Sequence, residues 1–341
     1  MEGELAALAR AGVLTHYFEV ARDVGLDPAP LLREAGLTRA MLSDPDSNIP
    51  LGAAMKLIER SAERSGCGSF GLRMGERRQP ADMGPVGLLL QHQATLRDAI
   101  QVIQRYEHLI NESLSVLAIE EDDLVVIREE LAPASGGAAP QSHELAVGVL
   151  FRFFGEILGP QWRPLEIRFV HSEPAETAIH RRLFRCPVLF GAEFNGLVIA
   201  RADFDRRNPQ ADAQMARYAR RFLDAMPDSR GAGIEQHVRN ALYILLPAGR
   251  GSLRCVADHL GLNVRTLQRR MEDANLTFAD ILDDVRAELA LRHLQNGGYP
   301  LNEIADLLGY SSHSAFSRWF GRRFHMSPRA HRLQNSAGRG S

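Results

Sequence analysis

An internal repeat near the C-terminal end constrains the fold of this 341-residue chain more than any other feature of its sequence. The repeat unit contains an alanine and, four residues later, a glycine followed by an apolar residue. It occurs first as Ala257, Gly261 and Leu262, and again 48 residues later as Ala305, Gly309 and Tyr310. A small residue lets two short helices approach closely, and the glycine allows a tight turn between them. The repeat therefore predicts two helix-turn-helix units in tandem.

The second helix of each predicted unit begins with a capping residue and carries an apolar face. Asn263 precedes this helix in the first unit, and Ser312 takes the same place in the second. Both residue types cap helices well. Apolar residues then follow at helical spacing and are expected to point inward. They are Val264, Leu267 and Met271 in the first unit, and Phe316, Trp319, Phe320 and Phe324 in the second.

The opposite face of each second helix is polar and carries side chains that can pair with base edges. Arginine can bind guanine through two hydrogen bonds, glutamine can bind adenine in the same way, and serine accepts several partners. A solvated surface helix would have a similar polar face, but two copies with the same cap, glycine and arginine positions favour recognition helices. The candidate DNA-contacting residues are Arg265, Thr266, Gln268, Arg269, His313, Ser314, Ser317, Arg318 and Arg322.

A longer helix is predicted between the two units. Thr277 and Asp280 form a variant of the capping box at its start, apolar residues follow at helical spacing, and Gly297 and Gly298 end it. A helix of about 18 residues is roughly 27 Å long. This length would hold two reading helices on one face of DNA, about one duplex turn apart.

The distribution of charge and of turn-forming residues divides the chain. Residues 232–341 carry 14 arginines against 10 acidic residues, whereas the rest of the chain carries 26 basic against 32 acidic residues. A basic C-terminal segment on an acidic body places the binding of a polyanion at the C-terminal end. We expect a domain over residues 1–226, a linker over 227–233, a DNA-binding domain over 234–333 and a flexible tail over 334–341.

The N-terminal part has both helical and strand patterns. Apolar residues recur at helical spacing in residues 14–25, 50–65, 95–110 and 142–158. Short strands are expected at residues 114–119, 124–127, 165–170 and 196–200, with an acidic turn between the first two. The predicted fold class is therefore a mixed α/β N-terminal domain for effector binding or dimerisation, followed by an all-α C-terminal domain.

No residue pattern predicts catalysis, a cofactor or a metal site. The three cysteines, Cys67, Cys186 and Cys255, are far apart and lack CxxC spacing, so we expect them to be small buried apolar residues. A GxGxxG pattern over residues 66–71 follows a helical segment rather than the strand that a dinucleotide site requires. The HxE pattern at residues 171–173 lacks the partner cysteines of a zinc deaminase.

Aromatic and histidine side chains of the N-terminal domain are candidates for lining an effector pocket. Packing in the core is the commoner fate of such residues, so the sequence leaves the effector-binding residues unassigned. The candidates are Tyr106, His108, His143, Phe151, Phe153, Phe154 and His171.

The sequence carries no pattern typical of membrane insertion or secretion. No apolar run reaches the roughly 18 residues that span a bilayer. The chain begins Met-Glu-Gly-Glu, which is acidic where a secretory signal is basic. We therefore expect a cytoplasmic protein that associates with the nucleoid.

Residues 234–332 resemble the DNA-binding domain of the AraC/XylS family of bacterial transcription regulators. The resemblance implies that Arg286, in the linker helix, is structural rather than a DNA contact. It further implies that the base-reading positions are Arg265, Gln268, Arg269, His313, Ser314, Ser317 and Arg318. Besides the repeat, the residues that carry the resemblance are Arg265 to Arg269, Val285, Arg286, Ala290, Leu294, Ile304, Phe316, Phe320, Phe324 and Pro328.

The N-terminal residues resemble, more loosely, the domain called arabinose-binding in the branch of this family that regulates ornithine use and virulence. The matching segments are residues 21–28, 70–75, 84–87 and 190–197, together with Thr95 and Leu96. The resemblance implies a domain that senses a small molecule and associates chains. The expected partners are double-stranded promoter DNA, RNA polymerase, a small-molecule effector and a second copy of the chain.

Two other interpretations stay open from the residues alone. The first is an enzyme fused to a DNA-binding module, for which Cys67 and Cys186 are the thiol candidates. The second is a regulator whose N-terminal domain dimerises and senses nothing. The sequence also leaves open the identity of the effector and the choice between activation and repression.

Overall fold

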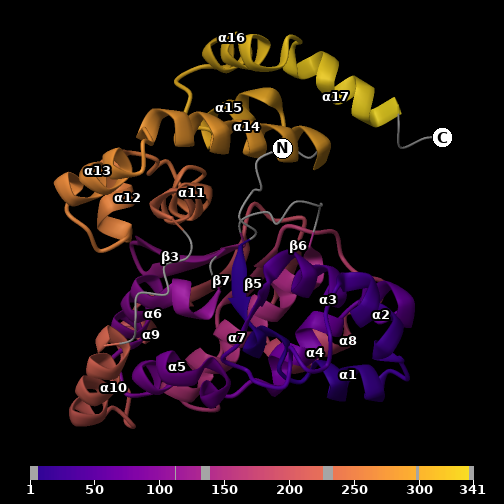
Figure 1. The fold of residues 1–341 in the computed structure, drawn as a ribbon, viewed down its shortest axis with the longest axis vertical. Helices are drawn as coiled ribbons and strands as arrows, with labels where there is room; N and C mark the ends of the chain where they lie inside the picture. Colours follow the sequence, from indigo (N-terminus) through magenta and orange to yellow (C-terminus); the bar gives the residue numbers. More distant parts are fainter. Residues whose placement is uncertain (1–6, 112, 132–138, 226–232, 297–298, 338–341) are drawn as a thin grey trace. The chain divides into compact units, whose positions relative to one another are not determined.

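The computed structural model describes residues 7–111, 113–131, 139–225, 233–296 and 299–337. The chain divides into two compact units, Met1–Ala232 and Gly233–Ser341, which are called unit 1 and unit 2 below. Most of the helices and strands of both units can be followed by their labels in Figure 1. Of the linker predicted over residues 227–233, only Gly233 belongs to the described residues.

Unit 1 combines helices with two β-sheets. Its strands are β1 (Leu8–Arg10), β2 (Asn48–Pro50), β3 (Leu114–Glu121), β4 (Leu124–Leu131), β5 (Glu166–Phe169), β6 (Val188–Phe190) and β7 (Asn195–Ala200). Its helices are α1 (Tyr17–Asp23), α2 (Pro28–Ala35), α3 (Leu51–Ser65), α4 (Phe70–Arg77), α5 (Gly84–Gln91), α6 (Leu96–Ile110), α7 (Pro140–Leu158), α8 (Ala178–Phe184), α9 (Arg201–Phe204) and α10 (Ala213–Ala225). Strands β1 and β2 form a small antiparallel pair.

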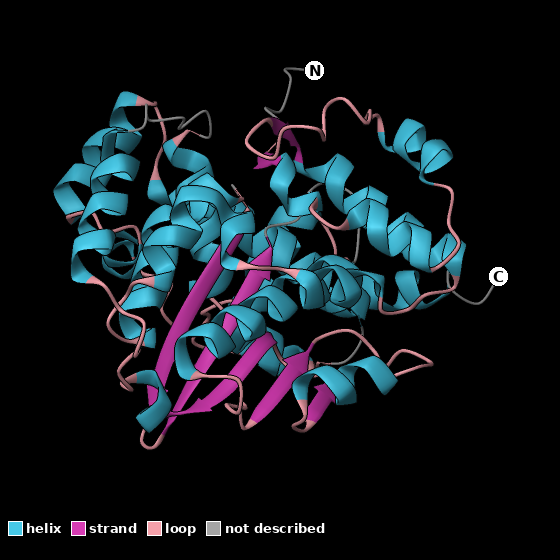
Figure 2. Cartoon of the chain, turned by 90° about the horizontal axis from the view of Figure 1, so that it is seen from below, coloured by secondary structure: helices cyan, strands magenta, loops and turns pink. Residues whose placement is uncertain are grey.

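The larger sheet, drawn as the group of long magenta strands in Figure 2, has the strand order β3-β4-β7-β5-β6. Neighbouring strands are antiparallel except β5 and β6, which are parallel. Ile127 of β4 lies opposite Leu197 of β7. Both side chains are fully buried in the same core cluster as Phe154 of α7, so α7 packs on this face of the sheet. Val126 and Val198, on the other face, belong to a separate small cluster.

A second core cluster joins the first four helices of unit 1. Tyr17, Leu57 and Phe70 are fully buried in it. The Tyr17 hydroxyl lies 3.0 Å from Ser61 Oγ, which gives this buried polar group a hydrogen-bond partner. Unit 1 therefore has two apolar cores, one under the sheet and one among its N-terminal helices.

The glycines of the GxGxxG pattern have conformational and packing roles. Gly66 ends α3 in the left-handed conformation, with a φ of 65°. Gly71 lies in α4 where this helix meets α7, and a Cβ atom there would lie 1.9 Å from the carbonyl oxygen of Gln141. The Gly71 N–H donates a hydrogen bond of 3.0 Å to Gln141 Oε1. Close approach of two helices accounts for the glycine at position 71.

Most of the helices and strands predicted for unit 1 are confirmed. Thr95 caps α6 by accepting a hydrogen bond of 3.1 Å from the backbone N–H of Asp98. The first two strands of the larger sheet continue beyond the predicted ends, to Glu121 and Leu131. The helix predicted over residues 14–25 is wrong in its first part, because His16 adopts a left-handed φ of 68° and α1 begins only after it.

Unit 2 is built from helices, which confirms its predicted all-α class. Its helices are α11 (Ile234–Leu245), α12 (Leu253–His259), α13 (Val264–Asp273), α14 (Phe278–Asn296), α15 (Leu301–Leu307), α16 (His313–Phe324) and α17 (Pro328–Ala337). Helix α17 includes residues 334–337, which the sequence placed in the tail, and residues 338–341 lie outside the described residues. Within the described ranges of both units, no helix has the length and apolar character needed to cross a membrane.

Two histidines of unit 2 are held in their neutral form. Burial, with a smaller contribution from the charge of Arg250, lowers the pKa of His259 to about 4. Burial and the charge of Arg292 lower the pKa of His293 to about 4 in the same way. The His293 ring packs edge-on against Tyr299, with 5.4 Å between the ring centroids. Both imidazoles therefore stay neutral in the folded unit until the pH approaches 4.

Acidification is expected to destabilise unit 2. The unfolded chain binds protons at a histidine pKa of about 6.5, whereas the folded unit does not until the pH approaches 4. The free energy of unfolding should therefore fall between pH 7 and pH 5 by about 1 to 2 kcal/mol per histidine. Trp319 is the tryptophan of unit 2, so its emission in a Trp162→Phe background reports this unfolding. His293→Phe should keep the packing and flatten the pH dependence, and an unchanged slope would contradict the assignment.

Two glycines in helices that contact each other should respond oppositely to alanine. Gly71→Ala forces a Cβ atom against the Gln141 carbonyl, so we expect a loss of stability of about 3 kcal/mol. Gly155→Ala in α7 places its Cβ where no atom lies within 4 Å, so we expect a gain of up to about 1 kcal/mol from helix propensity. Urea unfolding of the full-length variants measures both. Equal effects of the two substitutions would show that helix propensity, and not the contact with α7, governs position 71.

Candidate nucleic-acid interface

The turn of each helix-turn-helix unit is held by the same backbone hydrogen bond. The N–H of Leu262 donates to the carbonyl oxygen of Ala257 in the first unit, and the N–H of Tyr310 donates to that of Ala305 in the second, each at 2.9 Å. The glycine that precedes each donor has a left-handed φ, 64° in the first turn and 69° in the second. Glycine adopts this conformation without steric strain. The repeated sequence motif therefore gives both units the same turn geometry.

The predicted cap and apolar face of α13 are confirmed. Asn263 Oδ1 accepts a hydrogen bond of 2.8 Å from the backbone N–H of Thr266. Leu267 is fully buried and Met271 is 3% exposed. Val264, at the start of the helix, is half-buried. These contacts fix which side of α13 faces solvent.

Helix α16 has the same organisation with larger side chains. Ser312 Oγ accepts a hydrogen bond of 3.2 Å from the backbone N–H of Ala315, which confirms the predicted cap. Phe316 and Phe320 are fully buried, with 5.8 Å between their ring centroids. Trp319 is 8% exposed and completes the aromatic face. An aromatic core thus anchors α16 where aliphatic residues anchor α13.

The nine candidate DNA-contacting residues lie on the polar sides of α13 and α16. Seven are exposed, while Thr266 and Ser317 are half-buried. Ser317 Oγ lies 3.3 Å from His313 Nε2 on the neighbouring turn of α16. Four of the nine are arginines that form no hydrogen bond or ion pair in the described part of the chain. These arginines are Arg265, Arg269, Arg318 and Arg322.

Helix α14 holds α16 through two adjacent carboxylates. Asp283 Oδ1 accepts a hydrogen bond of 2.5 Å from the indole Nε1 of Trp319. Asp284 Oδ1 accepts one of 2.6 Å from the guanidinium of Arg323. No sequence motif predicted this role of the two carboxylates, although two adjacent acidic residues within a helix of apolar periodicity are a visible signal. They fix the orientation of α16 and neutralise one of its arginines.

Arg286 connects α14 to the turn of the second unit. Its Nε donates a hydrogen bond of 3.0 Å to the carbonyl oxygen of Leu308. Its guanidinium carbon lies 4.6 Å from the centroid of the Tyr310 ring, which is a cation–π contact. Burial raises the pKa of the Tyr310 hydroxyl. The structural role expected for Arg286 is confirmed.

The capping-box variant predicted at the start of α14 is confirmed. Thr277 Oγ1 donates a hydrogen bond of 2.7 Å to Asp280 Oδ2 and accepts one of 3.2 Å from the backbone N–H of Asp280. At 19 residues the helix is about 28 Å long. This length is somewhat shorter than the roughly 34 Å that separate successive major grooves on one face of DNA.

The cysteines are free, but their predicted burial is wrong. Cys67, Cys186 and Cys255 all have intermediate exposure. The first two pack against core clusters without being buried in them. The surroundings of Cys186 raise its pKa to about 11, mainly through burial of the thiol. A thiol with this pKa is protonated at neutral pH and is a weak nucleophile.

The aromatic candidates of unit 1 lie in the core, as their residue types favoured. All four are less than a tenth exposed and belong to the cluster under the larger sheet. They are Tyr106, Phe151, Phe153 and Phe154. The side chain of His108 lies outside the described residues.

The other histidine candidates belong to a polar cluster that the sequence did not reveal. His180 Nε2 lies 2.8 Å, and His171 Nε2 3.4 Å, from the same oxygen of Glu144. Nearby, His143 Nδ1 lies 2.9 Å from Glu129 Oε2. Burial lowers the pKa of His171. Among the residues that the structure describes, no group of histidine, cysteine, aspartate and glutamate side chains has the arrangement of a metal site.

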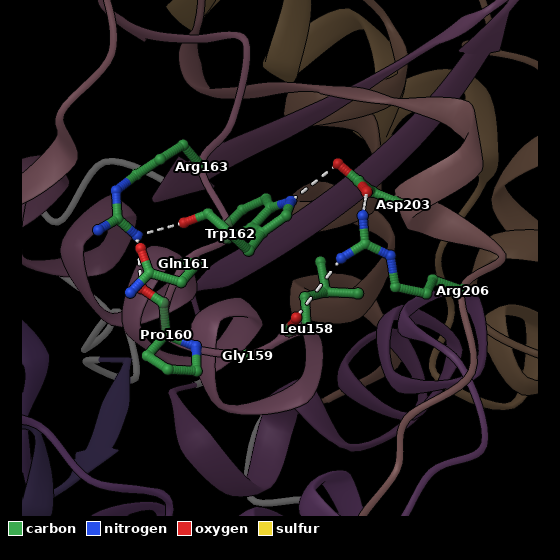
Figure 3. A pocket seen from close by; sticks show the side chains of 8 residues that line it. All are labelled: Leu158, Gly159, Pro160, Gln161, Trp162, Arg163, Asp203 and Arg206. Carbon is green, nitrogen blue, oxygen red and sulfur yellow. Dashed lines mark hydrogen bonds and ion pairs between the residues drawn. The ribbon is translucent and has the colours of Figure 1, made fainter.

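A pocket of about 380 Å³ in unit 1 lies beside the loop that follows α7 (Figure 3). Trp162 is fixed there by a hydrogen bond of 2.9 Å from its indole Nε1 to Asp203 Oδ2. Arg206 donates to the other carboxylate oxygen of Asp203. Arg163 donates a hydrogen bond of 2.8 Å to the carbonyl oxygen of Pro160 and another to that of Trp162. The loop is therefore ordered by its own side chains.

Comparisons with known proteins agree with this organisation. Residues 25–208 match the N-terminal arabinose-binding domain of AraC transcription regulators, and residues 256–334 match a helix-turn-helix domain. The chain is 30% identical over 331 residues to the HTH-type transcriptional regulator VirS of Mycobacterium tuberculosis, which covers 96% of this chain and 97% of VirS. It is 24% identical over 327 residues to the ornithine utilization regulator of Pseudomonas aeruginosa, which covers 94% and 95%.

One solved structure can be aligned over most of this chain. The crystal structure of the transcriptional regulator CdpR from Pseudomonas aeruginosa aligns over 90% of this chain and 96% of that chain, with 20% identity and a TM-score of 0.41. The matching family and the named relatives are transcription regulators rather than enzymes. Together with the two helix-turn-helix units, the N-terminal match and the relation to VirS place the chain in a family. This protein belongs to the AraC family of helix-turn-helix transcription regulators.

Proposed function

We propose that unit 2 binds double-stranded promoter DNA with sequence specificity by inserting α13 and α16 into successive major grooves. The observation that carries this proposal is the pair of capped helices with four outward arginine side chains, Arg265, Arg269, Arg318 and Arg322, that form no hydrogen bond or ion pair within the described residues. An exposed arginine without a carboxylate keeps its full set of donors for guanine or phosphate. The basic excess of residues 232–341 supports the same assignment.

The two helices should read different sequences. Helix α13 offers Gln268 for adenine, and it offers Arg265 and Arg269 for guanine or phosphate. Thr266 would lie near the sugar-phosphate backbone of the DNA. Helix α16 offers two arginines and a group of smaller polar side chains. These are His313, Ser314, Ser317, Arg318 and Arg322. Because the two sets of side chains differ, the two halves of the DNA site that one chain binds should have different base sequences.

The proposal extends to regulation through unit 1. A small molecule that binds unit 1 would change how the chain engages its promoter, and RNA polymerase and a second copy of the chain are the proposed protein partners. The protein would act in the cytoplasm, on the nucleoid, by binding rather than by catalysis. The half-buried Cys186, whose pKa is raised to about 11, favours a regulator over a thiol enzyme.

Alanine substitution of Arg269 and Arg318 tests the proposed reading helices. If each side chain forms two hydrogen bonds with a guanine, its loss should weaken binding to the cognate site by about 1 to 3 kcal/mol. It should also relax preference at one base position, in different halves of the site for the two variants. A phosphate contact would instead weaken binding to all sequences alike. Selection from randomised DNA followed by titration at fixed salt measures both effects for the full-length chain.

Two control variants separate reading from folding. Arg329→Ala removes an exposed arginine of α17 that forms no hydrogen bond or ion pair within the described residues, and should leave base preference unchanged. Leu267→Ala removes a fully buried side chain and should lower the stability of unit 2 by about 2 to 5 kcal/mol. The assignment of the reading helices is wrong if the two arginine variants unfold the unit. It is also wrong if both keep the wild-type base preference.

A further inference from the structure

A second and larger pocket of unit 1 adjoins the one in Figure 3 and shares its loop over residues 159–163. Its volume is about 830 Å³. It is bordered by α4, the C-terminal half of α7, the end of α8 and the segment at residues 209–210. Sites for small organic molecules usually measure about 300 to 1,000 Å³ and contain apolar surface with a few polar groups. The pocket therefore has the size of a small-molecule site.

The floor of this pocket is apolar and fixed in place. Phe151 and Trp162 contribute to its lining, are 7% and 5% exposed, and have ring centroids 6.0 Å apart. The bond from Trp162 to Asp203 holds the indole in one orientation. A ligand with an apolar body can therefore cover these rings without first ordering them.

Gly155 keeps the space above this floor open. It lies in the interior of α7, where glycine costs about 1 kcal/mol relative to alanine. Two other glycines, Gly71 in α4 and Gly148 in α7, have close neighbours, since a Cβ atom there would lie 1.9 Å and 3.1 Å from the nearest atom. At Gly155 no atom lies within 4 Å of the corresponding position. The missing side chain at Gly155 leaves pocket volume rather than making room for a neighbouring helix.

Among the described residues, two arginines of the pocket have no carboxylate partner. Four arginines and two glutamates line it. Arg182 pairs with Glu76 at 2.7 Å and Arg152 lies 3.7 Å from Glu156. Arg163 donates to two backbone carbonyls. In the described part of the chain, the side chain of Arg185 forms no hydrogen bond or ion pair. The pocket thus carries an excess of two positive charges beside an apolar floor.

We propose that this pocket is the effector site of unit 1 and that its ligand is a small organic anion with an apolar body. The anionic group would bind Arg163 and Arg185, and the apolar body would cover Phe151 and Trp162. A carboxylate accepts the paired donors of a guanidinium with good geometry, and partial removal from water strengthens this contact. A neutral sugar would give neither guanidinium a counter-charge. This inference rests on the proposed function of the chain as an effector-responsive regulator.

Three probes that differ only in their head group test the ligand class. They are 4-phenylbutyrate, 4-phenylbutanol and 4-phenylbutylamine, with L-arabinose as a fourth arm. Trp162 is the tryptophan of unit 1, so its emission in the full-length Trp319→Phe chain reports occupation of the site. We expect saturable quenching by 4-phenylbutyrate, binding at least tenfold weaker for the alcohol and the amine, and no competition by arabinose. Absence of binding by all probes, or equal binding of the three, would overturn the inference.

Pocket variants locate the binding. Arg163→Gln with Arg185→Gln should bring the affinity for 4-phenylbutyrate to that for the alcohol. Arg64→Gln is the matched control, because the exposed Arg64 side chain of α3 forms no hydrogen bond or ion pair within the described residues, and it should change nothing. Gly155→Leu should fill the pocket and abolish binding. Since Gly155→Leu adds bulk, its folding is checked by circular dichroism. If Gly155→Leu unfolds, the arginine double variant alone decides the test. Preference for the carboxylate that survives the double variant would contradict the site.

Promoter binding by the same variants separates this inference from the proposed function. The arginine pair and Gly155→Leu should retain full affinity for DNA in the absence of ligand, because none of these residues belongs to unit 2. Loss of the anion preference with intact DNA binding supports the site. Intact DNA binding together with an unchanged anion preference overturns the site and leaves the proposed DNA-binding function standing.

Discussion

The tight turn between the two helices of each helix-turn-helix unit is the constraint on which the DNA-binding unit depends. The hydrogen bond from Leu262 to Ala257, and its counterpart from Tyr310 to Ala305, close the turn only if the intervening residue has a left-handed φ. An L-residue with a Cβ atom pays roughly 1 to 2 kcal/mol for this conformation, and glycine does not. Once the turn is set, the cap and the apolar face of the second helix determine which side chains reach solvent.

The arginines of unit 2 divide according to their partners. Arg323 is paired with Asp284, and Arg286 is held by a backbone carbonyl and an aromatic ring. Arg318 lies on the same helix as Arg323 but has no such partner within the described residues. An ion pair inside the protein would compete with a base or phosphate for the same donors. The carboxylates of α14 therefore bind side chains on one side of α16, and they leave the side chains of its polar face available for a base or phosphate.

The local features of unit 2 could be predicted from the sequence because each depends on neighbouring residues. The turn glycines, the caps at Asn263 and Ser312, and the inward apolar residues are all of this kind. The contact between Asp283 and Trp319 could not be predicted, since 36 residues separate the two side chains. In unit 1, Gly71 and Gly155 look alike in the sequence, and only the packing of α4 against α7 shows that the first is crowded and the second is open. The half-buried state of the cysteines likewise depends on the outline of the packed core rather than on residue type.

Hydroxyl-radical footprinting of the full-length protein on a promoter fragment that it binds tests the central claim most directly. Two reading helices joined by α14, about 28 Å long, should protect two groups of sugars on one face of the duplex, about one helical turn apart. Substitution of Arg269 should remove protection from one group, and substitution of Arg318 should remove it from the other. A single protected group, or two groups on opposite faces of the duplex, would contradict the account.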